Sequence, residues 1–172
     1  RDVLHLIAII REQGGNNKPL SGVNPDAIGL MGHSMGGGIA LRVITVDPDI
    51  DAAVLYGSMS GDEARNFQKI REWSDGKRGQ QELGTPGEIL RHISPINYLD
   101  RIQAPVSIHH GEADYLVPPE WSQELCQLLR EKDKIVECFM YPGMPHTFYG
   151  ENDQLLVERT VRFFRDHLDH RP

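Results

Sequence analysis

Hydrophobic and polar positions follow two patterns along this chain, one typical of helices and one typical of short buried strands. In the first segment Val3, Leu4, Ile7 and Ile10 recur at helical spacing, and Gly14-Gly15 ends the pattern. The same spacing predicts helices over residues 2–13, 39–46, 119–131 and 153–168. Short apolar runs predict strands over residues 27–32, 52–56, 106–110 and 135–141. Strands that alternate with helices indicate an α/β fold, a mostly parallel sheet with helices on both faces.

Residues 58–100 interrupt this alternation. The segment is polar and is expected to hold at most two modest helices. Thr85-Pro86-Gly87-Glu88 predicts a helix start, with threonine as the cap, proline in the first helical position and Glu three residues after the cap. We interpret the segment as a helical insertion within one domain of residues 1–172. It is either a lid over a substrate pocket or a helix that packs on its own domain, and both interpretations stay open. The apolar positions at loosely helical spacing are Met59, Phe67, Ile70 and Trp73.

Composition narrows the choice of function by exclusion. With 172 residues, 39% of them apolar, the chain is long enough for one folded domain. A net charge of −7 without a basic stripe argues against a nucleic-acid partner. No apolar run is long enough for a membrane helix and no signal-peptide pattern is present, so we expect a soluble chain. The compartment is not fixed by the sequence, although the cytoplasm is favoured. Cys126 and Cys138 lack metal-site spacing and are expected to be free, buried thiols, with a bridge as the alternative.

The stretch Gly32-His33-Ser34-Met35-Gly36-Gly37-Gly38 lies between a predicted strand and a predicted helix. A serine at the apex of so tight a turn needs neighbours without Cβ atoms, which Gly32 and Gly36 are expected to provide. Such a turn exposes the serine hydroxyl above the sheet and points the next backbone N–H groups into the same space. Ser34 is therefore a candidate nucleophile and the Met35 N–H a candidate oxyanion donor. The alternative is a glycine-rich turn that binds phosphate or merely packs the helix closely.

A serine nucleophile requires a histidine base that a carboxylate orients. In a parallel α/β sheet these partners come from loops at the carboxyl ends of later strands. Asp114 follows the third predicted strand and His146 follows the fourth, so we predict them as the orienting acid and the base. Glu112 is the competing acid, whereas Asp100 precedes its strand and is excluded by topology.

The remaining histidines are weaker candidates. His109 and His110 are consecutive in a strand, so their side chains point to opposite faces and cannot act together. His33 is expected to face away from the apex of the turn and to serve in packing. The others are expected on helix surfaces, and no pair has convincing zinc spacing; they are His5, His92, His167 and His170.

With Ser34, Asp114 and His146 in this order along the chain, the sequence resembles the α/β-hydrolase superfamily, most closely its prolyl oligopeptidase and dienelactone hydrolase-like branch. The stretches that carry the resemblance are GHSMGG, SPINYLDRIQAPVSIHHGEADYLVPP and YPGMPHTF. The resemblance implies Ser34 as nucleophile, Asp114 as orienting acid, His146 as general base, and acyl transfer to water through an acyl-enzyme. It implies no metal or organic cofactor.

The chain departs from this resemblance in its extent. Members of the fold usually have about eight strands with the nucleophile turn after the fifth, whereas this chain supplies only the last four. The loop that usually donates the second oxyanion N–H is also absent. Strand 27–32 would leave an apolar edge unpaired, so we expect it to be covered, most simply by a missing N-terminal half of the same domain and alternatively by a swapped dimer.

Three functions are compatible with these residues. The leading prediction is a carboxylesterase that acts on small acyl esters. The second is a serine peptidase of the prolyl oligopeptidase type, and the third is a non-catalytic fragment that keeps the scaffold.

Overall fold

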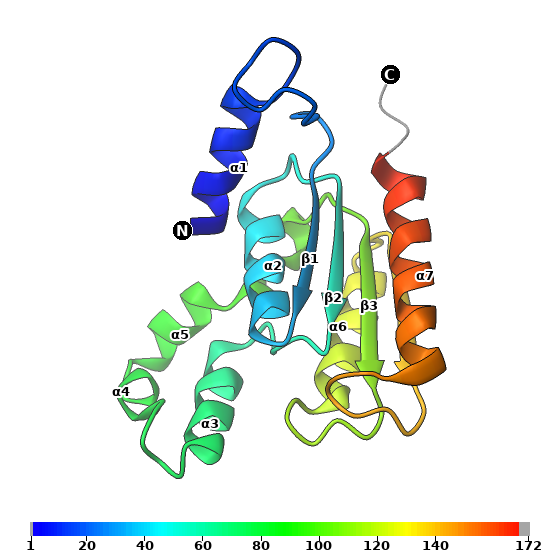
Figure 1. Cartoon of the computed structure of the whole chain (residues 1–172). Coiled ribbons are helices and arrows are strands. Elements are labelled where there is room, and N and C mark those ends of the chain that lie inside the picture. The colour runs from blue at the N-terminus through cyan, green and yellow to red at the C-terminus, as the bar shows by residue number, and fades with distance from the viewer. Residues whose placement is uncertain (1, 169–172) are drawn as a thin grey trace.

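Four strands form one sheet at the centre of the molecule (Figure 1). The computed structural model describes residues 2–168. The strands are β1 (Gly29–His33), β2 (Ala52–Tyr56), β3 (Val106–Gly111) and β4 (Val136–Tyr141), and they follow one another in space in that order. Each neighbouring pair is parallel, so the carboxyl ends of all four strands meet at one edge of the sheet. The predicted parallel α/β architecture is confirmed.

Helices cover both faces of this sheet. The residues of β2 point alternately to the two faces. Ala53 and Leu55 belong to the main apolar core, together with residues of the helices that flank β1 and β3 in sequence. Ala52 and Val54 point the other way and pack against Phe163 of the last helix. The α-helices of the main core are α1 (Asp2–Gln13), α2 (Met35–Val46) and α6 (Pro119–Glu131), and α7 (Gly150–Leu168) covers the opposite face.

The segment between β2 and β3 contains more helix than its polarity predicts. It forms α3 (Glu63–Trp73), α4 (Gln80–Leu83), α5 (Gly87–Ile93) and the 3₁₀ helix η1 (Pro95–Arg101), so the expectation of at most two helices was wrong. The start predicted at Thr85 was also one residue early, because Pro86 is the N-cap of α5 and no side chain caps that helix. Ion pairs hold this polar segment against the rest of the domain. Buried Glu63 of α3 pairs with Arg42 of α2, and Arg65 of α3 pairs with Glu124 of α6.

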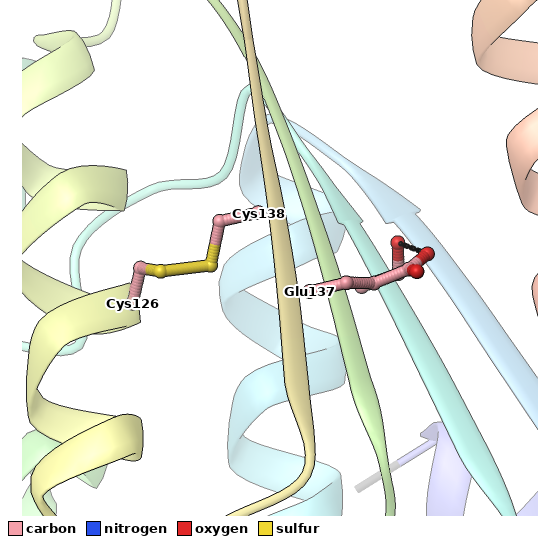
Figure 2. Close-up of a disulfide and its surroundings, with 4 residues drawn as sticks. Cys126, Glu137 and Cys138 are labelled. Carbon is pink, nitrogen blue, oxygen red and sulfur yellow. Dashed lines mark hydrogen bonds between the residues drawn. A yellow bond between two sulfur atoms is a disulfide. The ribbon is translucent and has the colours of Figure 1, made fainter.

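Cys126 and Cys138 are joined in a disulfide, so the prediction of two free thiols was wrong (Figure 2). Cys126 lies on α6 and Cys138 on β4, and their Cα atoms are 6.4 Å apart. A helix that packs directly on its neighbouring strand brings the two side chains together although 12 positions separate them in sequence. The bridge fastens α6 to the edge of the sheet.

β1 and β4 are the outer strands of the sheet. The unpaired edge expected for strand 27–32 is therefore present in the described chain, and Met31 of β1 is 52% exposed. Among residues 2–168, no helix has both the length and the apolar character needed to cross a lipid bilayer.

Candidate active site

Ser34 occupies the single position between β1 and α2. Its backbone has φ 58° and ψ −119°, a conformation that residues with a Cβ rarely adopt. Hydrogen bonds hold it there: the Ser34 N–H donates to the Tyr56 carbonyl at 2.9 Å, and the Ser34 carbonyl accepts from Met59 N at 3.0 Å. Met35 is the first residue of α2, where a helix leaves the N–H without a partner inside the helix. The sequence-predicted turn is thus formed, with a strained serine at its apex.

Two glycines flank Ser34 in the motif, but only one is required by space. A Cβ on Gly32 would lie 2.2 Å from the Gly36 carbonyl oxygen, whereas a Cβ on Gly36 would meet nothing within 4 Å. The expectation that Gly36 makes room for the turn was therefore wrong. Gly37 has the second steric role instead, because a Cβ there would lie 2.6 Å from the Ser58 side chain.

Asp114 and His146 are hydrogen-bonded to each other. The distance from His146 Nδ1 to Asp114 Oδ2 is 2.6 Å, and the other carboxylate oxygen accepts the N–H groups of Leu116 and Val117 at 2.9 Å each. A carboxylate can only accept here, so Nδ1 of His146 carries the proton and Nε2 is the ring nitrogen left for other partners. The Asp114 side chain is fully buried and that of His146 is 11% exposed.

The loops that carry Asp114 and His146 are locked to one another by close backbone contact. A Cβ on Gly111 would lie 2.2 Å from the Met144 carbonyl oxygen, and the Ala113 N–H donates to that oxygen at 3.0 Å. Gly57, directly after β2, also lies close, since a Cβ there would be 3.3 Å from His146 Nδ1. The loop after β2 and the two loops after β3 and β4 therefore meet around one imidazole.

His33 links this imidazole to the serine turn. Its ring lies 4.5 Å from the His146 ring, its Nε2–H donates to the His146 carbonyl at 3.0 Å, and it stacks on Tyr56 at 4.2 Å. Burial lowers the pKa of His33, which keeps the ring neutral beside His146. The expectation that His33 only packs away from the site was wrong. Ser34 Oγ makes no side-chain hydrogen bond to the start of α2 or to another group within residues 2–168, and catalytic hydrogen bonds are often long before substrate binds.

His110, one of the weaker candidates from sequence, also lies at the site. It lies on β3 and contacts the Asp114 carboxylate at 3.1 Å. The competing acid Glu112 is exposed and does not take part in this contact. His5 and His92 are exposed on helices as expected, His167 packs half-buried against Phe163, and His170 lies outside the described residues.

Two other features of the described chain bear on ligands. Among residues 2–168, no group of three or more His, Cys, Asp or Glu side chains is arranged to hold a metal ion. A cavity of about 710 Å³ lies between α1, α2, α5 and η1, and Ser34, Asp114 and His146 are not among its lining residues. This cavity therefore belongs to a different part of the molecule from the candidate site.

Comparison with known proteins identifies the family and the fold of the chain. The model of the prolyl oligopeptidase family matches residues 19–171. The uncharacterized peptidase YtmA of Bacillus subtilis is 27% identical over 150 residues, a match that spans 84% of this chain and 57% of the relative's own length. The structure of the acylaminoacyl peptidase of Pyrococcus horikoshii matches with a TM-score of 0.77 at 20% identity, over 99% of this chain and 28% of that chain. A Klebsiella pneumoniae structure assigned as a dienelactone hydrolase matches with a TM-score of 0.67 at 19% identity, over 96% and 60% of the two chains. At these identities the structural matches establish the α/β-hydrolase fold alone.

Proposed function

Because the chain belongs to the prolyl oligopeptidase family, we propose that it is part of a serine hydrolase whose catalytic residues are Ser34, Asp114 and His146. The recognition of an α/β-hydrolase of this branch from sequence is confirmed. The observation that carries the proposal is the hydrogen bond of 2.6 Å between His146 and Asp114, placed beside the turn that presents Ser34.

The proposed chemistry follows from these positions. His146 Nε2 takes the proton of Ser34 Oγ as the oxygen attacks the substrate carbonyl carbon, and the Met35 N–H stabilises the resulting oxyanion. The same imidazole then protonates the leaving group, and an ester forms between Ser34 and the acyl group. Water, deprotonated by His146, cleaves this ester and restores the serine. Asp114 holds the imidazole in the required tautomer and stabilises its positive charge.

We propose a peptidase rather than an esterase as the specific activity. The family match and the name of the Bacillus relative support this choice, because both concern peptidases. The carboxylesterase expected from sequence remains the second candidate, favoured by the structural match to the dienelactone hydrolase. Comparing the cleavage of prolyl and aminoacyl p-nitroanilides with that of p-nitrophenyl acetate separates the two, because an esterase would cleave only the ester.

The match to YtmA covers 57% of that relative, so the proposed activity concerns the whole protein rather than the described residues alone. We propose that further strands pair with the open edge of β1 and that a segment near them donates the second oxyanion N–H. The role of residues 58–100 as a lid likewise stays a prediction. The ion pairs that anchor α3 to α2 and α6 favour a fixed α3 over a moving one.

A fluorophosphonate probe tests the nucleophile directly, since it reacts only with an activated serine. We expect covalent labelling that is abolished in Ser34→Ala and retained in Ser58→Ala. Ser58 is a matched control because it lies beside the same turn, is 2% exposed, and donates its hydroxyl to the Met59 carbonyl. Labelling that survives in Ser34→Ala would reject the proposal, and a parent protein that is not labelled at all would favour the non-catalytic alternative.

A further inference from the structure

Two consecutive histidines of β3 are equally buried but have different surroundings. Both side chains are 0% exposed. His109 faces α7 and bonds to the hydroxyls of Ser107 and Tyr141 at 2.9 and 2.8 Å. His110 faces α6 and bonds to Ser122 Oγ at 2.6 Å through Nδ1. Only His110 also reaches the carboxylate of the candidate site, so the pair offers a natural comparison.

The hydrogen-bond partners fix the tautomer of His110. Its Nε2 lies 3.1 Å from Asp114 Oδ2 and 3.1 Å from the Val117 carbonyl oxygen, and both of these atoms can only accept. Nε2 therefore carries a hydrogen. Burial lowers the pKa of His110, partly offset by these two contacts, so the ring is neutral and Nδ1 has a lone pair. The Ser122 hydroxyl must then donate to Nδ1, and it selects the tautomer whose Nε2–H is shared between the Asp114 carboxylate and the Val117 carbonyl.

The Asp114 carboxylate has donors on both oxygens. Oδ2 accepts from the rings of His146 and His110, and Oδ1 accepts from the backbone N–H groups of Leu116 and Val117. Four donors leave the group no freedom to rotate, and each draws off part of its negative charge. His146 is the ring that can exchange protons with a substrate, because its side chain is partly exposed whereas that of His110 is fully buried.

We propose that His110 is a positioning residue for the reaction. Its Nε2–H holds Asp114 Oδ2 toward His146 and reduces the negative charge that the Asp114 carboxylate presents to the His146 ring. This role rests on the proposed function. His110 does not exchange a proton with the substrate, and it acts only through Asp114. The proposal explains why a fully buried position on the core side of β3, where Val106 and Ile108 precede it, carries an imidazole rather than another apolar side chain.

Two other titratable side chains lie against His146 or its loop. His33 at the end of β1 and Tyr56 at the end of β2 face His146 or its loop. Burial lowers the pKa of His33 and raises that of Tyr56, so both are neutral at pH 7; Asp153 of α7 acts on Tyr56 in the same direction as burial. The charge balance at the site therefore depends on Asp114, His146 and the N–H from His110.

The test compares His110→Phe, His110→Gln and His109→Phe by the rate of fluorophosphonate labelling as a function of pH. Without the His110 N–H, the carboxylate holds the protonated form of His146 more strongly and is less well oriented. We expect His110→Phe to label about tenfold more slowly, the value of one hydrogen bond to a charged group, and to reach half-maximal labelling at higher pH. His110→Gln keeps an N–H in reach of Asp114 and should recover most of the rate. His109→Phe should lose stability without a change in the midpoint.

A midpoint in His110→Phe equal to that of the parent, or the same shift in His109→Phe, would overturn the proposal. If His110→Phe does not fold, Ser122→Ala replaces it, since it allows the other tautomer and should give a smaller change in the same direction. Proton NMR of the His146 Nδ1–H separates this proposal from the proposed function, because it requires no nucleophile. A parent that is not labelled defeats the proposed function, whereas an unchanged Nδ1–H resonance in the His110 variants defeats the role of His110.

Discussion

Replacing Gly32 and Gly36 separately with alanine tests how the serine turn is built. In Gly32→Ala the new Cβ would lie 2.2 Å from the Gly36 carbonyl oxygen and 2.4 Å from its carbon, both backbone atoms. Non-bonded heavy atoms normally sit about 3.5 Å apart, so the turn must open by roughly 1 Å. Overpacking of this kind costs about 1–3 kcal/mol. Gly36→Ala meets no atom within 4 Å and lies in the first turn of α2, where alanine favours the helix by up to about 1 kcal/mol.

Thermal unfolding followed by circular dichroism measures both effects. For a chain of this size each kcal/mol shifts Tm by about 2–4 °C. We therefore expect Gly32→Ala to lower Tm by roughly 2–12 °C, and Gly36→Ala to leave it unchanged or raise it by a few degrees. Labelling of Ser34 should fall in Gly32→Ala, because the strained backbone of the serine would move with the turn. Equal losses of stability in the two variants, or a stable Gly32→Ala, would refute the steric argument.

Two further predictions concern the stability of the sheet. Reduction of the Cys126–Cys138 disulfide, or the Cys138→Ser variant, should lower the free energy of unfolding by about 3 kcal/mol, because the bridge closes a loop between residues 12 positions apart. Urea titration with and without reductant measures this loss, and an unchanged unfolding midpoint would contradict the bridge. Burial lowers the pKa of His109 to about 3, below its unfolded value of about 6.5, so the unfolded chain binds the extra proton and stability falls as the pH drops through this window. Between pH 7 and pH 5 the parent should lose about 2 kcal/mol more than His109→Gln, and equal losses in the two proteins would count against a neutral buried His109.

The residues that the structure brings together at the sheet edge could be placed from sequence because a parallel sheet imposes their order. Once four apolar runs were taken as parallel strands, the loops after β1, β3 and β4 had to meet at one edge, and Asp114 and His146 do contact each other there. Element bounds were most accurate where the chain offers sharp signals. β2 and α6 have the predicted bounds, the first from a continuous apolar run and the second from Pro119 at its start.

His33, His110 and the cysteine pair could not be placed in the same way. Alternation along a strand correctly put His109 and His110 on opposite faces, but it does not say what else lies on each face. The available signal was the spacing, since Asp114 follows His110 by four residues, across a turn in which the Asp114 N–H donates to the Gly111 carbonyl at 3.1 Å. For Cys126 and Cys138, no local pattern reveals that one helix face touches one strand face.

The disulfide between α6 and β4 changes what a single chain break would do. The connection between these elements, residues 132–135, contains Lys132, which is exposed, and Lys134, which is half-buried, and trypsin can cut after either lysine. After such a nick Asp114 would belong to one fragment and His146 to the other. The two fragments would nevertheless migrate as one species without reductant and separate only when the bridge is opened, because Cys126 and Cys138 lie on either side of the cut.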